Sequence, residues 1–134
     1  MLKKEIAYED FLGNKQNESF FFNLTKTELT ELEVKYPGGF GGYLQKIAAE
    51  QNAEKMYDVV KELVLKSYGE ISQDGKKHLK SEEKRKEFEC HAAFDALMSE
   101  LTTDADKMSE FVLGIMPAEL SKEARKTLET KSNS

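Results

Sequence analysis

Apolar and polar residues alternate along the first 24 positions of the chain. Ile6, Tyr8 and Phe11 are the large apolar residues of a first segment flanked by charged residues, and residues 20–24 place apolar side chains at every second position. Such alternation predicts two β-strands, and the polar, turn-forming residues 13–17 between them predict a hairpin. A lone hairpin is only marginally stable in water, so we expect the phenylalanines of the second strand to be buried against helices. The alternative is that they form an exposed binding patch.

Beyond residue 24 the spacing of apolar residues lengthens to three and four, which predicts about five helices. Thr25 and Glu28 have the spacing of a capping box, and Asn52, Ser81 and Asp104 are each suited to cap the start of a helix. The expected helices lie at about 25–35, 43–48, 52–68, 81–101 and 104–115.

The segment Ser67–Ser81 joins two of these helices and carries unusually clear turn signals. Tyr68 and Gly69 predict the end of a helix, because glycine commonly closes a helix in the left-handed conformation. Asp74 and Gly75 predict a tight turn, and Ser81 then caps the next helix. We therefore interpret these residues as a rigid structural joint that fixes the angle between two long helices.

The predicted fold is mainly α, with an N-terminal β-hairpin (1–24) packed on a compact bundle of about five helices. Residues 1–117 are expected to form this single domain. The remaining residues, 118–134, are polar, with only Leu120, Ala124 and Leu128 as apolar anchors in their helical pattern. We expect them to form a mobile C-terminal extension that is weakly helical or disordered.

Charge and composition restrict the classes of function. The chain has a net charge of −5, which argues against nucleic-acid binding because phosphates require a basic surface. No apolar run has the length of a membrane span, and the first residues do not have the pattern of a signal peptide, so we expect a soluble, intracellular protein. Cys90 is the single cysteine and cannot form an internal disulfide; we expect it to be buried or half-buried in a helix.

The residues that could act in catalysis or bind a metal form no recognisable motif. The two histidines lack metal-binding spacing, and no phosphate loop or nucleophile motif occurs, so we expect neither an enzyme nor a bound cofactor. One helix is rich in methionine, a side chain that adapts to varied partners. Its residues Met108, Phe111, Ile115 and Met116 are our candidates for a partner-binding or self-association surface. The alternative is that this helix simply closes the core.

Four blocks of sequence, taken together, resemble a known family. They are residues 20–29, an aromatic strand running into a capped helix; residues 67–81, the joint; residues 88–104; and residues 111–117. In this order and at this spacing the chain resembles the tail assembly chaperones of long-tailed, siphovirus-type bacteriophages of Gram-positive bacteria. His78 stands where an aromatic residue would be expected, which departs from the pattern without touching a functional residue.

The resemblance implies a function that spacing alone does not give. Such proteins bind the very long tape measure protein and keep it soluble while tail tube protein polymerises around it, and they are absent from the finished virion. This chain would be the short form of a pair whose longer member arises by ribosomal frameshifting, acting in the cytoplasm of the infected or lysogenic host. The implied partners are the tape measure protein, with the tail tube protein, the longer form and further copies of the chain as additional candidates. The alternative function is a small adaptor or regulatory module that binds a protein partner through its aromatic strand.

Overall fold

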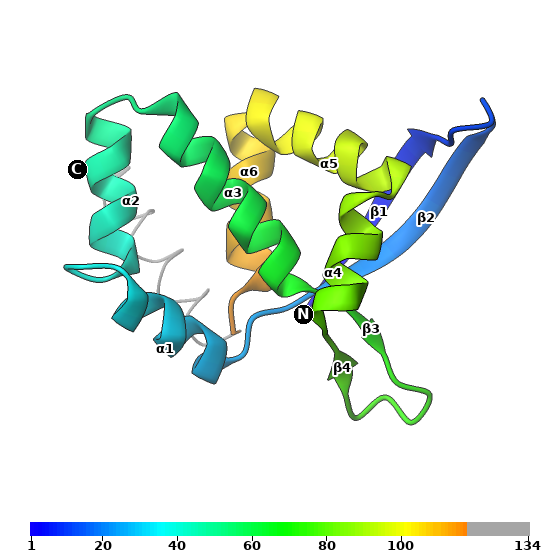
Figure 1. Cartoon of the computed structure of the whole chain (residues 1–134), viewed down its shortest axis with the longest axis horizontal. Helices are drawn as coiled ribbons and strands as arrows, with labels where there is room; N and C mark the ends of the chain where they lie inside the picture. The colour runs from blue at the N-terminus through cyan, green and yellow to red at the C-terminus, as the bar shows by residue number, and fades with distance from the viewer. Residues whose placement is uncertain (118–134) are drawn as a thin grey trace.

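The computed structural model describes residues 1–117, which form an antiparallel sheet with strand order β1-β2-β3-β4 and six helices (Figure 1). The strands are β1 (Leu2–Glu9), β2 (Lys15–Phe22), β3 (Tyr68–Ile71) and β4 (His78–Leu79). The helices are α1 (Lys26–Lys35), α2 (Phe40–Ala49), α3 (Ala53–Ser67), α4 (Glu82–Glu89), α5 (Ala92–Thr103) and α6 (Ala105–Ile115). The predicted mainly α fold with an N-terminal hairpin is confirmed. The extension predicted for 118–134 lies outside the described residues.

The hairpin β1–β2 is paired along its whole length, from Leu2↔Phe22 to Glu9↔Lys15. Phe20 and Phe22 are 9% and 0% exposed, so their expected burial is confirmed. Phe11, expected in the first strand, instead lies in the turn and is 84% exposed. The reason is local: the carboxylate of Asp10 accepts hydrogen bonds from the backbone N–H groups of Leu12 and Asn14, both at 2.9 Å, and ends the strand there.

Local capping signals explain where the helices begin. Thr25 and Glu28 form the predicted capping box at the start of α1. The side chain of Asn52 accepts a hydrogen bond from the N–H of Lys55 at 3.0 Å and starts α3. Each of these contacts joins residues three apart, which is why the sequence predicts them. Val34 of α1 is apolar and yet 81% exposed, so it does not pack on the core.

The segment after α3 differs from its prediction. Tyr68 and Gly69 do not end the helix with a left-handed glycine; they begin strand β3, which pairs with β2 at Phe21↔Gly69 and Phe22↔Tyr68. The turn at Asp74 and Gly75 is confirmed, with Gly75 at a φ of 74°. Ser81 caps α4 by accepting from the N–H of Lys84 at 3.1 Å, also as predicted. The joint is therefore a short hairpin that extends the sheet.

The single long helix expected at 81–101 is broken at Cys90 and His91. The ring of His91 caps α5 by accepting a hydrogen bond at Nδ1 from the N–H of Ala93, at 2.9 Å. The same ring lies edge-on to Tyr8 and Phe20 of the hairpin, with centroid separations of 5.2 and 5.4 Å. Because the chain bends here, Cys90 is exposed and not buried or half-buried as expected.

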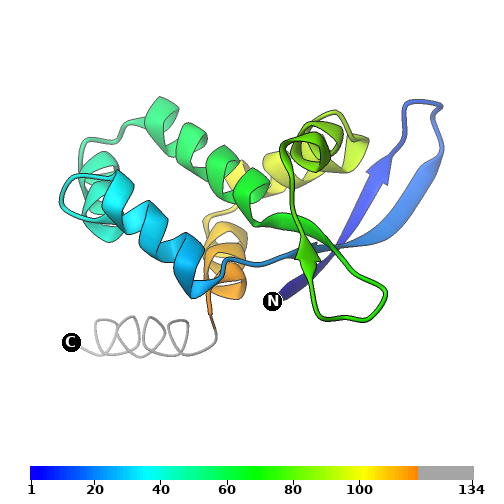
Figure 2. The same ribbon diagram turned by 60° about the horizontal axis from the view of Figure 1, so that its bottom comes forward.

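The core joins the sheet to the helices, because its buried residues come from β1, β2 and each of the six helices, whose arrangement Figure 2 shows. Phe22 is central to it, with ring contacts to Tyr68, Phe88 and Phe111 at 5.9, 5.8 and 5.2 Å. Helix α5 packs along β1, and the N–H of Leu24 donates to the carbonyl oxygen at the end of α6, that of Ile115, at 2.7 Å. These contacts hold the last described helix against the strands.

Candidate functional site

A groove of about 460 Å³ lies between α3 and the corner that joins α5 to α6. It is lined by Ala53, Met56, Tyr57 and Val60 from α3, by Leu101, Thr102 and Thr103 from α5, and by Ala105 and Met108 from α6. We call this the α3–α6 groove.

The corner between α5 and α6 positions one wall of the α3–α6 groove. Asp104 ends α5 and caps α6, its carboxylate accepting from the N–H groups of Asp106 and Lys107 at 3.0 and 3.2 Å. Because a single residue makes the turn, Met108 in the first turn of α6 lines the same groove as Leu101 of α5. The predicted cap at Asp104 is thus what shapes this side of the groove.

The α3–α6 groove is apolar in its chemistry. Its lining has no charged side chain, and its polar groups are the hydroxyls of two threonines and one tyrosine. Met56 and Met108 are half-buried, and Tyr57 is 46% exposed at the rim. A flexible thioether wall beside an aromatic ring can pack against apolar side chains of different shapes. The groove therefore suits an apolar helix face better than a polar small molecule.

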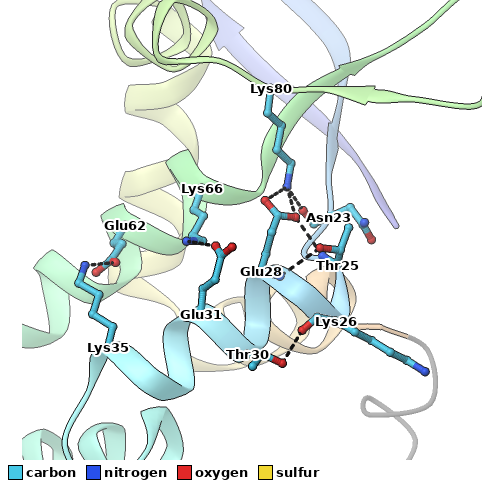
Figure 3. Close-up of polar contacts among 10 residues, drawn as sticks. All are labelled: Asn23, Thr25, Lys26, Glu28, Thr30, Glu31, Lys35, Glu62, Lys66 and Lys80. Atoms are coloured by element: carbon cyan, nitrogen blue, oxygen red, sulfur yellow. Dashed lines mark hydrogen bonds and ion pairs between the residues drawn. The ribbon is translucent and has the colours of Figure 1, made fainter.

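A second feature is the polar cluster that ties α1 to the end of β4 (Figure 3). Nζ of Lys80 donates to both carboxylate oxygens of Glu28, at 2.7 and 2.8 Å, and to the carbonyl oxygen of Asn23 at 2.6 Å. Burial alone would raise the pKa of Glu28, but the hydrogen bonds from Lys80 and Thr25 outweigh it and hold that pKa below its ordinary value. Burial lowers the pKa of Lys80, and Glu28 opposes the shift only in part.

A row of ion pairs extends this cluster along the seam between α1 and α3. Glu62 binds Lys35 at 2.7 Å and accepts from the hydroxyl of Tyr36 at 2.5 Å, while Lys66 lies 3.6 Å from Glu31. Every charge here has an opposite partner within the fold. The cluster and the seam therefore link α1 to the residue after β4 and to α3.

The described part of the chain shows neither a metal-binding cluster nor a membrane-spanning helix. Within residues 1–117, no group of three or more His, Cys, Asp or Glu side chains is arranged to hold a metal ion. Among the helices of that same range, none is both long enough and apolar enough to cross a bilayer.

Comparison with protein families decides the assignment. The family model described as phage tail assembly chaperone matches residues 1–134. The chain belongs to the phage tail assembly chaperone family. The comparisons with curated proteins and with solved structures gave no match. The resemblance found in the sequence is confirmed at the level of the family, while the siphovirus type and a Gram-positive host remain predictions.

The candidate contact residues of this tail assembly chaperone separate into two groups. Phe111 and Ile115 are 3% and 0% exposed and belong to the core, as the alternative of a core-closing helix requires. Met108 lines the α3–α6 groove, and Met116 is half-buried at the end of α6. Partner contact by Met108 and Met116 stays a prediction.

Sequence reasoning missed the α3 wall of the chaperone's groove. Met56 and Val60 lie on the apolar face of α3 that the sequence periodicity predicts to be buried. Periodicity does not show which part of that face lines the groove instead. Tyr57 is next to Met56 in sequence, so no periodic signal links them. The one available indication was the presence of methionine on both α3 and α6.

Proposed function

We propose that this tail assembly chaperone binds the tape measure protein by holding an apolar helical segment of it in the α3–α6 groove. The observation that carries the proposal is the groove's uncharged lining, with Met56, Tyr57 and Met108 partly exposed on it. The chaperone would act by binding alone, without catalysis, in the cytoplasm of the host bacterium, and would leave before the virion is complete. Tail tube protein, a frameshift-extended form and further copies of the chain are additional proposed partners.

The size of the groove indicates reversible binding. A helix could place two or three apolar side chains in it, spaced three and four residues apart. Each buried side chain contributes about 1.5–3 kcal/mol, and association itself costs several kcal/mol. The net affinity per groove is therefore modest. That suits a protein that must release its client as the tail tube assembles, and several copies would be needed along a long client.

Co-expression with tape measure fragments tests the proposal. The variant Tyr57→Glu with Met108→Glu places two charges in the groove at positions that already have exposed atoms, so the fold should persist. We expect it to lose the ability to keep the fragments in the soluble fraction. The matched control is Val34→Glu, which adds a charge at an apolar residue 81% exposed on α1 and outside the groove. The proposal fails if the folded double variant solubilises the fragments as well as the wild type does.

A further inference from the structure

Strand β2 has an open edge along its first half. On the side of β3, pairing is confined to Phe21↔Gly69 and Phe22↔Tyr68. Beyond Gly69, β3 pairs with β4 instead, at Glu70↔Leu79 and Ile71↔His78. The hairpins β1–β2 and β3–β4 consequently diverge from the point where β2 and β3 meet (Figure 1). Residues 15–19 of β2 therefore have no strand beside them on this side within the described chain.

The hydrogen-bond pattern of the sheet determines which residues of β2 direct their backbone N–H and C=O groups toward this open edge. The N–H of Asn23 donates to the carbonyl oxygen of Ser67 at 2.8 Å, so Asn23 faces the β3 side. In an antiparallel ladder every second residue directs its N–H and C=O to the same side. Counting back by twos through Phe21 places the backbone groups of Ser19 and Asn17 on the open edge. The intervening residues turn theirs toward β1.

A notch of about 460 Å³ lies between this edge and α4. Its floor is aromatic and includes Phe20, Tyr68, Phe88 and the ring of His91. Tyr68 stacks on Phe88 with ring centroids 4.1 Å apart and an interplanar angle of 4°. The floor is therefore already assembled in the folded chain. A segment extended along β2 would direct alternate side chains onto it.

The rim of the notch is acidic. Glu18, Glu70 and Glu87 line it, and no lysine or arginine does. Lys84 pairs with Glu70 at 2.8 Å, and the Tyr8 hydroxyl donates to Glu18, a bond that raises the pKa of Tyr8 to about 12. Glu87 forms no ion pair among residues 1–117. Anionic groups of this kind attract a cationic partner and repel an anionic one.

We propose that the notch binds an extended, lysine- or arginine-bearing segment of a partner protein, which adds to the sheet beside residues 15–19 of β2. Backbone hydrogen bonds to Asn17 and Ser19 hold the segment, its inward side chains cover Tyr68 and Phe88, and its basic side chains meet the glutamates of the rim. The site shares no residue with the α3–α6 groove. Its success or failure is therefore independent of the proposed client binding.

Amide hydrogen exchange on the full chain tests this inference. The probe is a seven-residue peptide of alternating valine and lysine, compared with one in which glutamate replaces lysine. We expect the lysine peptide to slow exchange at the amides of Asn17 and Ser19, with affinity at least about tenfold higher than that of the glutamate peptide. Equal binding of the two peptides, or protection confined to other strands, would overturn the proposal.

Two pairs of variants sharpen the test. Asn17→Pro removes an N–H group that faces the open edge, a position where proline is tolerated, and should abolish the peptide's protection of the Ser19 amide. Asn17→Ala keeps the N–H group and should preserve that protection. Glu87→Gln should weaken binding of the lysine peptide about three- to fivefold. Glu50→Gln makes the same charge change at the residue that follows α2, away from the notch, and should have no effect. If Asn17→Pro does not fold, the Glu87 pair decides: wild-type affinity in Glu87→Gln contradicts the proposed site.

Discussion

Lys80 and Glu28 form a two-point ion pair, with Nζ of the lysine 2.7 and 2.8 Å from the two carboxylate oxygens. The same Glu28 carboxylate accepts the N–H of Thr25 at 3.0 Å and so completes the capping box of α1. The Glu28 side chain therefore caps the N-terminus of α1 and also links α1 to Lys80, the residue that follows β4. The pair is largely shielded, with Lys80 12% and Glu28 20% exposed.

Removing the cation from this pair should cost stability. We expect Lys80→Met to lower the free energy of unfolding by about 2 kcal/mol, because Glu28 and the carbonyl oxygen of Asn23 both lose a charged donor. Urea unfolding measures the change. Glu28→Gln is the informative companion, since glutamine preserves the capping box while removing the negative charge. A loss below about 0.5 kcal/mol in Lys80→Met would mean that the pair is screened like an ordinary surface contact.

Gly69 should tolerate no side chain. A Cβ built there would lie 2.7 Å from Nε2 of His78 and 2.8 Å from the carbonyl oxygen of Leu79. Since the second contact is with backbone, we expect Gly69→Ala to cost about 2 kcal/mol. Gly42→Ala is the matched control, because nothing lies within 4 Å of its added Cβ and the residue is helical. It should stabilise the chain by about 0.5 kcal/mol in the same thermal unfolding experiment.

The ring of His78 should make stability depend on pH. Its Nε2 lies 3.2 Å from the carbonyl oxygen of Phe21, and burial lowers its pKa below the ordinary 6.5. Above about pH 6.5 both folded and unfolded chains carry the neutral ring. As the pH falls below that value the unfolded chain binds a proton that the folded ring resists, so stability declines by at most about 1.4 kcal/mol per pH unit.

His78→Phe should remove this part of the pH dependence. Urea midpoints at pH 7.5, 6.5 and 5.5 measure it, in a range where the carboxylates stay charged. Because the two proteins differ only at residue 78, the difference between their profiles isolates the contribution of that residue. Parallel pH profiles for the wild type and His78→Phe would show that His78 titrates alike in the folded and unfolded chains.

Phe111 and Met108 should behave differently although they are three residues apart on α6. Phe111 is 3% exposed and contacts Phe22, so Phe111→Ala should cost about 3–4 kcal/mol by leaving a cavity. Met108 lines the groove and is half-buried, so Met108→Ala should cost about 1 kcal/mol. Equal losses would indicate that α6 buries both side chains alike.

Features set by neighbouring residues could be predicted from the sequence. The caps at Thr25, Asn52, Ser81 and Asp104 each depend on a side chain bonding to a backbone group two or three residues away, and all four are present. Burial of the second strand's aromatic face followed from its period of two. These signals need no knowledge of the rest of the fold.

Features set by distant residues could not be predicted in the same way. Strand β3 exists because Tyr68 and Gly69 pair with Phe22 and Phe21 of β2, which lie 46 and 48 residues earlier in the chain. The break before α5 is stabilised by packing of His91 on Tyr8 and Phe20. The α3–α6 groove likewise arises from helices brought together by the fold, so periodicity identifies the apolar faces of those helices but not the gap between them.

The bend between α4 and α5 has a practical consequence. It leaves Cys90, the one thiol in the sequence, exposed beside His91, whose ring lines the notch next to β2. A fluorophore attached to that sulfur would sit one residue along the chain from the lining of the notch, without an engineered cysteine. The α3–α6 groove is lined by other elements, so the same label would respond differently to a client bound there. The natural sequence therefore carries its own attachment point for distinguishing the two proposed binding events.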